Sequence, residues 1–204
     1  MFLITSMLIA TNIFALPSNK TVIRNSAITS NAQVNEVKAI NRSHANVGVE
    51  AKQSNISNSQ INVKTKATKV EALNNSRVNT GFIANRSRIG NSRINVDTRG
   101  SGRGTVIRAT NNSTVNTGFE GNDATVKNSR INVKTQMDIV QAHNNSKVNT
   151  GVQANRAKIK NSNINVTSES IPRRDPIAGN YSKVNTGLEA NDTRIKNSRI
   201  DAYI

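Results

Sequence analysis

The chain has 204 residues, a formal net charge of +16 and no cysteine. The lack of cysteine excludes disulfides and thiolate metal sites, and the two histidines, His44 and His143, are too few for a histidine-based metal site without carboxylate ligands. Low apolar content with high net charge would suit a disordered chain, so a case for a folded protein must come from the residue pattern.

The first segment, Met1 to Leu16, is apolar and carries no charged side chain. It is too short to span a bilayer and fits the apolar region of a secretory signal peptide, with the small residue Ala15 at a cleavage position. We expect residues 1–15 to be a signal peptide and 16–204 one exported domain, extracellular or at the cell surface after transit through the periplasm. No later segment predicts a membrane span. The alternative is an amphipathic or buried first element.

Two short units alternate along the rest of the chain. One reads Asn-Ser-x-Val-Asn-Thr-Gly, as in Asn75 to Gly81, and the other reads Asn-Ser-x-Ile-Asn-Val, as in Asn91 to Val96. Each unit is about 16–17 residues long, and two successive units form a superrepeat of about 33 residues. Internal repetition at such a period is typical of solenoids and other repeat architectures.

Each unit has the pattern of β-strands. Apolar and β-branched residues alternate, as in Val78, Thr80 and Phe82, and a period of two indicates a strand. Asn-Ser and Gly-Asn steps between the runs supply turn residues. The sequence therefore predicts an all-β fold, a β-solenoid of stacked strand-turn-strand rungs. Phe82 and Phe119 share a slot with Val49, Val152 and Leu188, and we expect this slot to face the core.

Two ways of closing a coil fit the pattern. One coil can hold a single unit, or it can take the full superrepeat. The shared Ser and Asn slots of the two units favour the thinner coil, with one unit per coil.

Asparagine recurs three residues after the repeated serine. In stacked coils, equivalent side chains lie one above the other, and their amides can form a hydrogen-bonded ladder. We expect a structural ladder at Asn46, Asn62, Asn79, Asn95, Asn116, Asn132, Asn149, Asn165 and Asn185.

Two insertions, near 97–106 and 167–178, interrupt the period, and we expect both at one corner of the solenoid. The Gly-rich segment from Arg99 to Gly104 lacks the Lys-Ser/Thr and the helix of a phosphate-binding loop.

Tandem Asn-rich strand-turn-strand repeats behind a signal peptide resemble the secreted functional-amyloid subunits of the curli type. The resemblance is architectural and covers Thr21 to Ile204, because Ser and Asn stand here in place of the curli-type Gln ladder. It implies extracellular fibres and assigns no role to a particular residue.

Basic residues recur at outward-facing slots, so stacking is expected to align them into a stripe. Such a stripe predicts attraction to anionic polysaccharide, lipopolysaccharide or extracellular nucleic acid; the alternative is a role in solubility and in blocking unwanted edge pairing. The stripe comprises Arg77, Arg88, Arg93, Lys127, Arg130, Lys147, Lys158, Lys160, Lys183, Arg194, Lys196 and Arg199.

The sequence predicts neither an enzyme nor a cofactor, metal or small-molecule substrate. Glu50, Glu120 and Glu189 share one slot that we expect to face solvent, and the repeated serines are expected to be ladder members. Thr80 recurs on the inward face as Thr117, Thr150 and Thr186, which argues against an ice-binding threonine array.

The repeat continues to the last residues without a polar cap, which favours end-to-end stacking of copies. The resulting hypothesis is a secreted structural or adhesive surface protein that assembles into curli-like fibres, as in biofilms. The alternative is a monomeric basic solenoid that binds anionic polymers.

Overall fold

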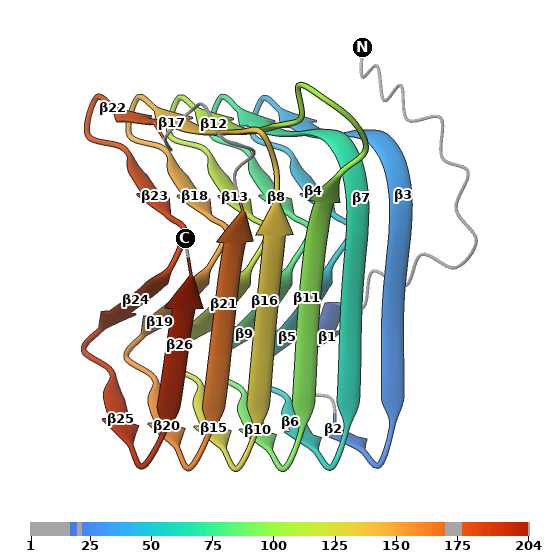
Figure 1. Cartoon of the computed structure of the whole chain (residues 1–204), viewed down its shortest axis with the longest axis vertical. Coiled ribbons are helices and arrows are strands. Elements are labelled where there is room, and N and C mark those ends of the chain that lie inside the picture. The colour runs from blue at the N-terminus through green and yellow to red at the C-terminus, as the bar shows by residue number, and fades with distance from the viewer. Residues whose placement is uncertain (1–16, 20–21, 170–176, 204) are drawn as a thin grey trace.

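The structure is a computed structural model that describes residues 17–19, 22–169 and 177–203. The expected signal peptide and the centre of the second insertion lie outside these residues. The described part of the chain contains strands and no helix, and all strand pairs are parallel. The expected β-solenoid is confirmed (Figure 1).

Each coil passes through four sheets in the order A, B, C and D. Sheet A consists of β1 (Pro17–Asn19), β5 (Val49–Lys52), β9 (Phe82–Asn85), β14 (Phe119–Asn122), β19 (Val152–Asn155) and β24 (Leu188–Asn191). Sheet B consists of β2 (Val22–Arg24), β6 (Asn55–Ser57), β10 (Arg88–Gly90), β15 (Thr125–Lys127), β20 (Lys158–Lys160) and β25 (Arg194–Lys196).

Among the described residues, sheet C has the most strands and sheet D the fewest. Sheet C consists of β3 (Ala27–Ile40), β7 (Gln60–Leu73), β11 (Arg93–Gly100), β12 (Val106–Thr110), β16 (Arg130–Gln136), β17 (Ile139–His143), β21 (Asn163–Glu169), β22 (Ile177–Gly179) and β26 (Arg199–Tyr203). Sheet D consists of β4 (His44–Asn46), β8 (Arg77–Asn79), β13 (Thr114–Asn116), β18 (Lys147–Asn149) and β23 (Lys183–Asn185).

One coil takes both sequence units. Ile56 of β6 pairs with Ile89 of β10, and Val63 of β7 pairs with Val96 of β11. In each pair the two residues are one full superrepeat apart in the sequence. The expectation of one unit per coil is therefore wrong. The Ile-Asn-Val unit forms the first half of sheet C, and the Val-Asn-Thr-Gly unit forms sheet D and leads into sheet A, so the two units never stack on each other.

The corners explain why the two units differ. The turn from sheet B to sheet C has one residue with a positive φ, such as Asn91 (φ 49°), whereas the turn from sheet C to sheet D has two, such as Asn74 and Asn75 (φ 57° and 61°). Asparagine adopts this left-handed conformation more easily than most residues. The two corners therefore differ in the number of left-handed residues, with one in the turn before sheet C and two in the turn before sheet D.

The core consists of two apolar clusters inside the coil. One lies between sheets A and B and the first half of sheet C, and the other lies between the second half of sheet C and sheet D. Phe82 and Phe119 are fully buried in the first cluster, with ring centroids 5.6 Å apart and ring planes at 7°. Their column continues through Val152 to Leu188, so the expected inward slot is confirmed.

A column of glycines marks the corner between sheets D and A. A Cβ added to Gly81 would overlap the carbonyl oxygen of Gly118, and one added to Gly151 would overlap that of Gly187. Successive coils therefore approach so closely that only glycine fits. The preceding threonines Thr80, Thr117 and Thr150 are fully buried, as expected of an inward face.

Candidate functional site

The asparagines of the expected ladder form two separate columns. In sheet D, Asn116 donates to Asn79 over 2.9 Å and Asn149 donates to Asn116 over 2.8 Å. In sheet C, Asn132 donates to Asn95 and Asn165 to Asn132, each over 2.8 Å. The sheet D column contains Asn46, Asn79, Asn116, Asn149 and Asn185, and the sheet C column contains Asn62, Asn95, Asn132 and Asn165.

Two further amide ladders were missed in the sequence. One runs along the end of sheet A through Asn85, Asn122, Asn155 and Asn191. The other follows the corner from sheet C to sheet D through Asn41, Asn74, Asn111, Asn144 and Asn180. The recurrence of Asn at a spacing of one full coil was the signal that could have identified both.

The two columns of asparagines differ in burial. Asn116 is 1% exposed, whereas Asn132 is only half-buried, although both donate and accept one ladder hydrogen bond. We expect Asn116→Ala to lower the free energy of unfolding by about 2–3 kcal/mol and Asn132→Ala by about 1 kcal/mol, because an unpaired polar group costs more when water cannot reach it. Urea denaturation of both variants checks this, and equal losses would contradict it.

The repeated serines form their own ladders. The amide of Ser92 donates to Ser129 Oγ over 3.2 Å, while Ser92 Oγ donates to the carbonyl of Gly90 over 2.7 Å. The same arrangement recurs at Ser59 and Ser162. Their hydroxyls are thus engaged by the backbone within and between coils.

The structure distributes the twelve basic residues over two regions. Arg88, Lys158 and Arg194 occupy one outward column of sheet B, and Lys127, Lys160 and Lys196 occupy the next. Arg93, Arg130 and Arg199 begin the adjoining strands of sheet C. Arg77, Lys147 and Lys183 lie apart on sheet D. The nine residues of sheets B and C form what we call the basic edge, and all twelve are exposed.

Most of these cations have no acidic neighbour. Lys183 pairs with Glu189 over 2.6 Å and Arg199 pairs with Asp201 over 2.8 Å. The other ten form no ion pair with any residue in the described part of the chain. Along sheet B, Lys127 lies beside Lys160, and Lys160 beside Lys196, in adjacent strands.

An open groove follows the corner between sheets B and C over all the coils. Its lining combines asparagines, serines and the first residues of the sheet C strands: Asn25, Ser26, Ala27, Asn58, Ser59, Gln60, Asn91, Ser92, Arg93, Asn128, Ser129, Arg130, Asn161, Ser162, Asn163, Asn197 and Arg199. The asparagines of the turn are exposed and Asn163 is half-buried, whereas inner serines such as Ser92 are 5% exposed. We call this feature the corner groove.

The opposite half of sheet C has balanced charges. Glu71 is 3% exposed because three cations surround it: Lys69 at 2.9 Å, Arg108 at 3.6 Å and Lys38 at 3.7 Å. Ion pairing between neighbouring coils, as of Glu71 with Lys38 and Arg108, is therefore a device that this chain uses. Among the described residues that line the corner groove, Arg199 alone forms an ion pair, and its partner Asp201 lies in the same strand.

The expectation that Glu50 faces solvent is wrong. Glu50 is 4% exposed, with Lys52 Nζ 3.1 Å and His44 Nε2 4.0 Å from its carboxylate oxygens. The chain bends inward between sheets D and A (Figure 1), so outward side chains on the two sides of this corner face each other. Glu120 and Glu189, in the same column, are half-buried.

Two pKa values at this corner are shifted. Burial lowers the pKa of His44, and the positive charges of Arg77 and Lys52 lower it further, against the attraction of Glu50. For Glu189, burial opposes ionisation, but hydrogen bonds from Lys183 and Asn191 outweigh it and lower the pKa of the carboxyl group. Both groups therefore favour the ionisation states that prevail at neutral pH.

The first insertion is held by an acidic side chain from the next coil. The amides of Gly104 and Thr105 donate to Asp138 Oδ2, the latter over 3.1 Å, and the amide of Asp138 donates to Thr105 Oγ1 over 3.0 Å. The backbone amides at the end of the Gly-rich segment thus already donate hydrogen bonds to a carboxylate of the same chain.

Among residues 17–19, 22–169 and 177–203, no group of three or more His, Cys, Asp or Glu side chains could hold a metal ion. In the same residues, no helix has the length and apolar character needed to cross a membrane. Comparison with protein-family models, curated proteins and solved structures finds no match to this chain.

Proposed function

We propose that this chain is a secreted structural protein whose copies stack end to end into a surface fibre. The observation that carries the proposal is the exposed core of the last described coil. Ile195 of β25 is 37% exposed, whereas Ile89, Val126 and Ile159, which occupy the same column in inner coils, are 1–2% exposed. Covering such apolar area is favourable at roughly 25 cal/mol per Å².

The first described coil offers a matching surface. Ile23 begins the column that Ile195 ends, and β1, β2, β3 and β4 each pair with only one strand among the described residues. Among the described residues, Ser26 Oγ accepts no hydrogen bond from a backbone amide of a preceding coil. Ser59 Oγ, by contrast, accepts a hydrogen bond from the backbone amide of Ser26. A following copy would therefore continue both the apolar columns and the ladders in register.

The end is stepped, which limits the contact. Within the described residues, sheets A and B contain six strands and sheet D contains five. A second copy can seat its first coil on β24, β25 and β26, while sheet D remains one coil short. The contact is head to tail, and repetition of a heterologous contact that does not close generates a filament. The secreted location is supported by the apolar, uncharged segment Met1 to Leu16.

The test is negative-stain electron microscopy, with sedimentation, of the chain from Leu16 onward and of Ile195→Lys. We expect the unaltered chain to form fibres of constant width and Ile195→Lys to remain monomeric, because the new charge would be buried in the contact. Ser57→Lys adds the same charge to the lateral face of sheet B and should still form fibres. A chain that stays monomeric at high concentration, or fibres from Ile195→Lys, would refute the proposal.

A further inference from the structure

We propose that the corner groove and its basic edge bind an extended acidic polysaccharide laid parallel to the solenoid axis. The first reason is the uncompensated charge. Lys127, Lys160 and Lys196 flank the groove on the sheet B side, and Arg93 and Arg130 line it on the sheet C side. None of these five has an ion pair with a described residue, so each retains its full attraction for an external anion.

The second reason is a row of amides without partners. The side chains of Asn58, Asn91, Asn128 and Asn161 line the groove, are exposed and form no hydrogen bond with the described residues. At the corner from sheet C to sheet D, by contrast, Asn74, Asn111 and their equivalents bond to one another in a ladder. The second asparagine of that corner, as in Asn75, Asn112 and Asn145, is also exposed and has no side-chain hydrogen bond with the described residues. The strands that precede it end in Leu73, Thr110 and His143, however, so only the corner groove places free amides directly after lysines such as Lys127 and Lys160.

Unpaired cations beside free amides indicate the chemistry of the ligand. Free amides can donate to and accept from hydroxyl groups, and Lys and Arg side chains bind carboxylates through charge-assisted hydrogen bonds. A polymer of sugar acids carries both hydroxyls and carboxylates along its length. The turn asparagines recur in every described coil at about 4.8 Å, and each coil from Arg93 to Lys196 adds at least one cation beside them.

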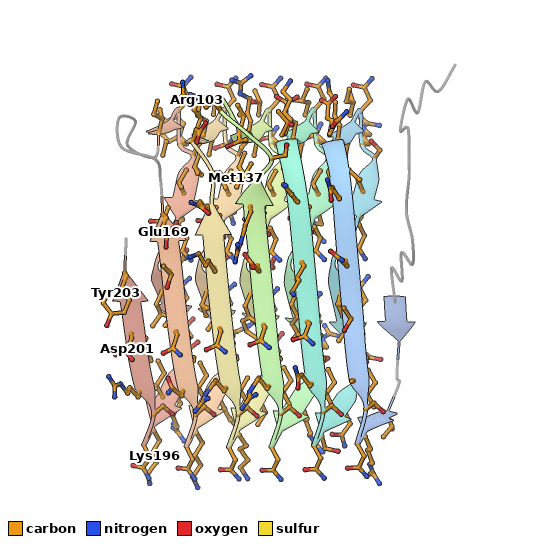
Figure 2. All side chains as sticks on the ribbon, turned by 45° about the vertical axis from the view of Figure 1, so that its right-hand side comes forward. Arg103, Met137, Glu169, Lys196, Asp201 and Tyr203 are labelled. Atoms are coloured by element: carbon orange, nitrogen blue, oxygen red, sulfur yellow. The ribbon has the colours of Figure 1, made fainter. Side chains whose placement is uncertain are left out.

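Nucleic acid fits the same surface less well. Single strands bind through stacking of bases on aromatic side chains, and no aromatic residue lines the corner groove among the described residues. The phosphates of a duplex follow a helical path with a turn of roughly 34–36 Å, whereas the groove runs straight along the coils. Figure 2 shows this edge as a row of side chains that project at the corner where Lys196 is labelled.

The direct test is binding of the full chain to immobilised polygalacturonate, with dextran as the neutral comparison, at two salt concentrations. We expect binding to polygalacturonate and not to dextran, and weaker binding at the higher salt concentration. The triple variant Lys127→Gln, Lys160→Gln and Lys196→Gln should bind roughly tenfold more weakly or worse, because binding of this kind depends on the number of anions neutralised.

The matched control removes the same charge elsewhere. Lys64, Lys66 and Arg103 are exposed and form no ion pair with a described residue, and Arg103 lies at the opposite end of the molecule from Lys196 (Figure 2). Lys64→Gln, Lys66→Gln and Arg103→Gln together should change the affinity by less than about twofold, since these charges lie outside the groove. An equal loss in both triple variants would mean that net charge alone determines binding, and would overturn the proposal.

A gain of affinity gives a second, independent readout. In the second coil the positions equivalent to Lys160 and Arg130 are Ser57 and Gln60. Ser57→Lys with Gln60→Arg extends the basic edge by one coil and should tighten binding to polygalacturonate. Preferential binding to duplex DNA at equal anion concentration would reassign the groove to nucleic acid. The proposal concerns a lateral face, so it does not depend on whether copies stack.

Discussion

Gly118→Ala is expected to lower the free energy of unfolding by about 3–5 kcal/mol, near the upper limit for a single substitution. The added methyl carbon would overlap the carbonyl oxygen of Gly151 and lie 2.9 Å from the carbonyl carbon of Thr150. Both are backbone atoms, so no rotation of a side chain can relieve the clash. The coils must separate at this corner, which strains the hydrogen bond from Phe119 N to the Gly151 carbonyl.

Urea denaturation followed by circular dichroism measures this loss. Gly90→Ala is the matched control, because no atom lies within 4 Å of the Cβ that it would add. Gly90 is on sheet B, and alanine there should change the stability by less than about 0.5 kcal/mol, as is usual for a surface substitution. Similar losses in the two variants would show that the close approach of the coils is not what selects glycine.

The fold class could be predicted from the sequence because each inward position repeats its chemistry from coil to coil. Val63, Val96 and Val133 are all buried, whereas the intervening residues Asn62 and Asn95 are half-buried. A strand that alternates in this way has only one face suited to a core. Repetition at a fixed period then requires neighbours with the same pattern, which is the property that defines a solenoid.

The closure of the coil could not be predicted from shared slots, because those slots describe strands and not corners. The difference between the corners was nevertheless present in the sequence. A pair of asparagines, such as Asn74 and Asn75, precedes the serine before sheet D, while a single one, such as Asn91, precedes it before sheet C. The geometry of each turn follows from these left-handed residues. Attention to the turns would therefore have favoured a full superrepeat in each coil.

The candidate site depended on that closure. With one unit per coil, Lys147 and Lys160 would belong to a single stripe, but with two units per coil they lie on different sheets. The burial of Glu50 likewise follows from the inward bend between sheets D and A, which no local pattern predicts. The free amides of the corner groove are visible only when the partners of every asparagine are known.

The second large effect is expected in the aromatic stack. Phe119→Ala should lower the free energy of unfolding by about 3–5 kcal/mol, because it removes a fully buried ring and leaves a cavity beside Phe82. The surroundings cannot fill this space easily. Phe119 is held between coils whose backbone spacing is set by hydrogen bonds, including those of the Gly118 and Phe119 amides.

The neighbour of Phe119 shows how the core adjusts to residue size. Gly121 occupies a column that holds Ala84 and Ala154 in the adjacent coils, and a Cβ added to Gly121 would lie 3.1 Å from Phe119 Cε1. The glycine thus leaves more room beside the Phe119 ring than the alanine that accompanies Phe82 in the preceding coil. In the next coil, Val152 and Ala154 occupy the same two positions, so a smaller apolar residue is accompanied there by a larger neighbour.

This relation predicts a coupling that denaturation can measure. Phe119→Val should destabilise the chain, and Gly121→Ala added to it should recover part of the loss, because the pair then matches Val152 and Ala154. Residues in contact commonly couple by about 0.5–3 kcal/mol, and the sign here should be favourable. If the stability effects of the two substitutions were simply additive, contact with the Phe119 ring would not be the reason for glycine at position 121. Because the same two columns hold Phe82 with Ala84, Phe119 with Gly121 and Val152 with Ala154 in successive coils, we expect the core to accept several pairs of residues rather than one particular residue at each position.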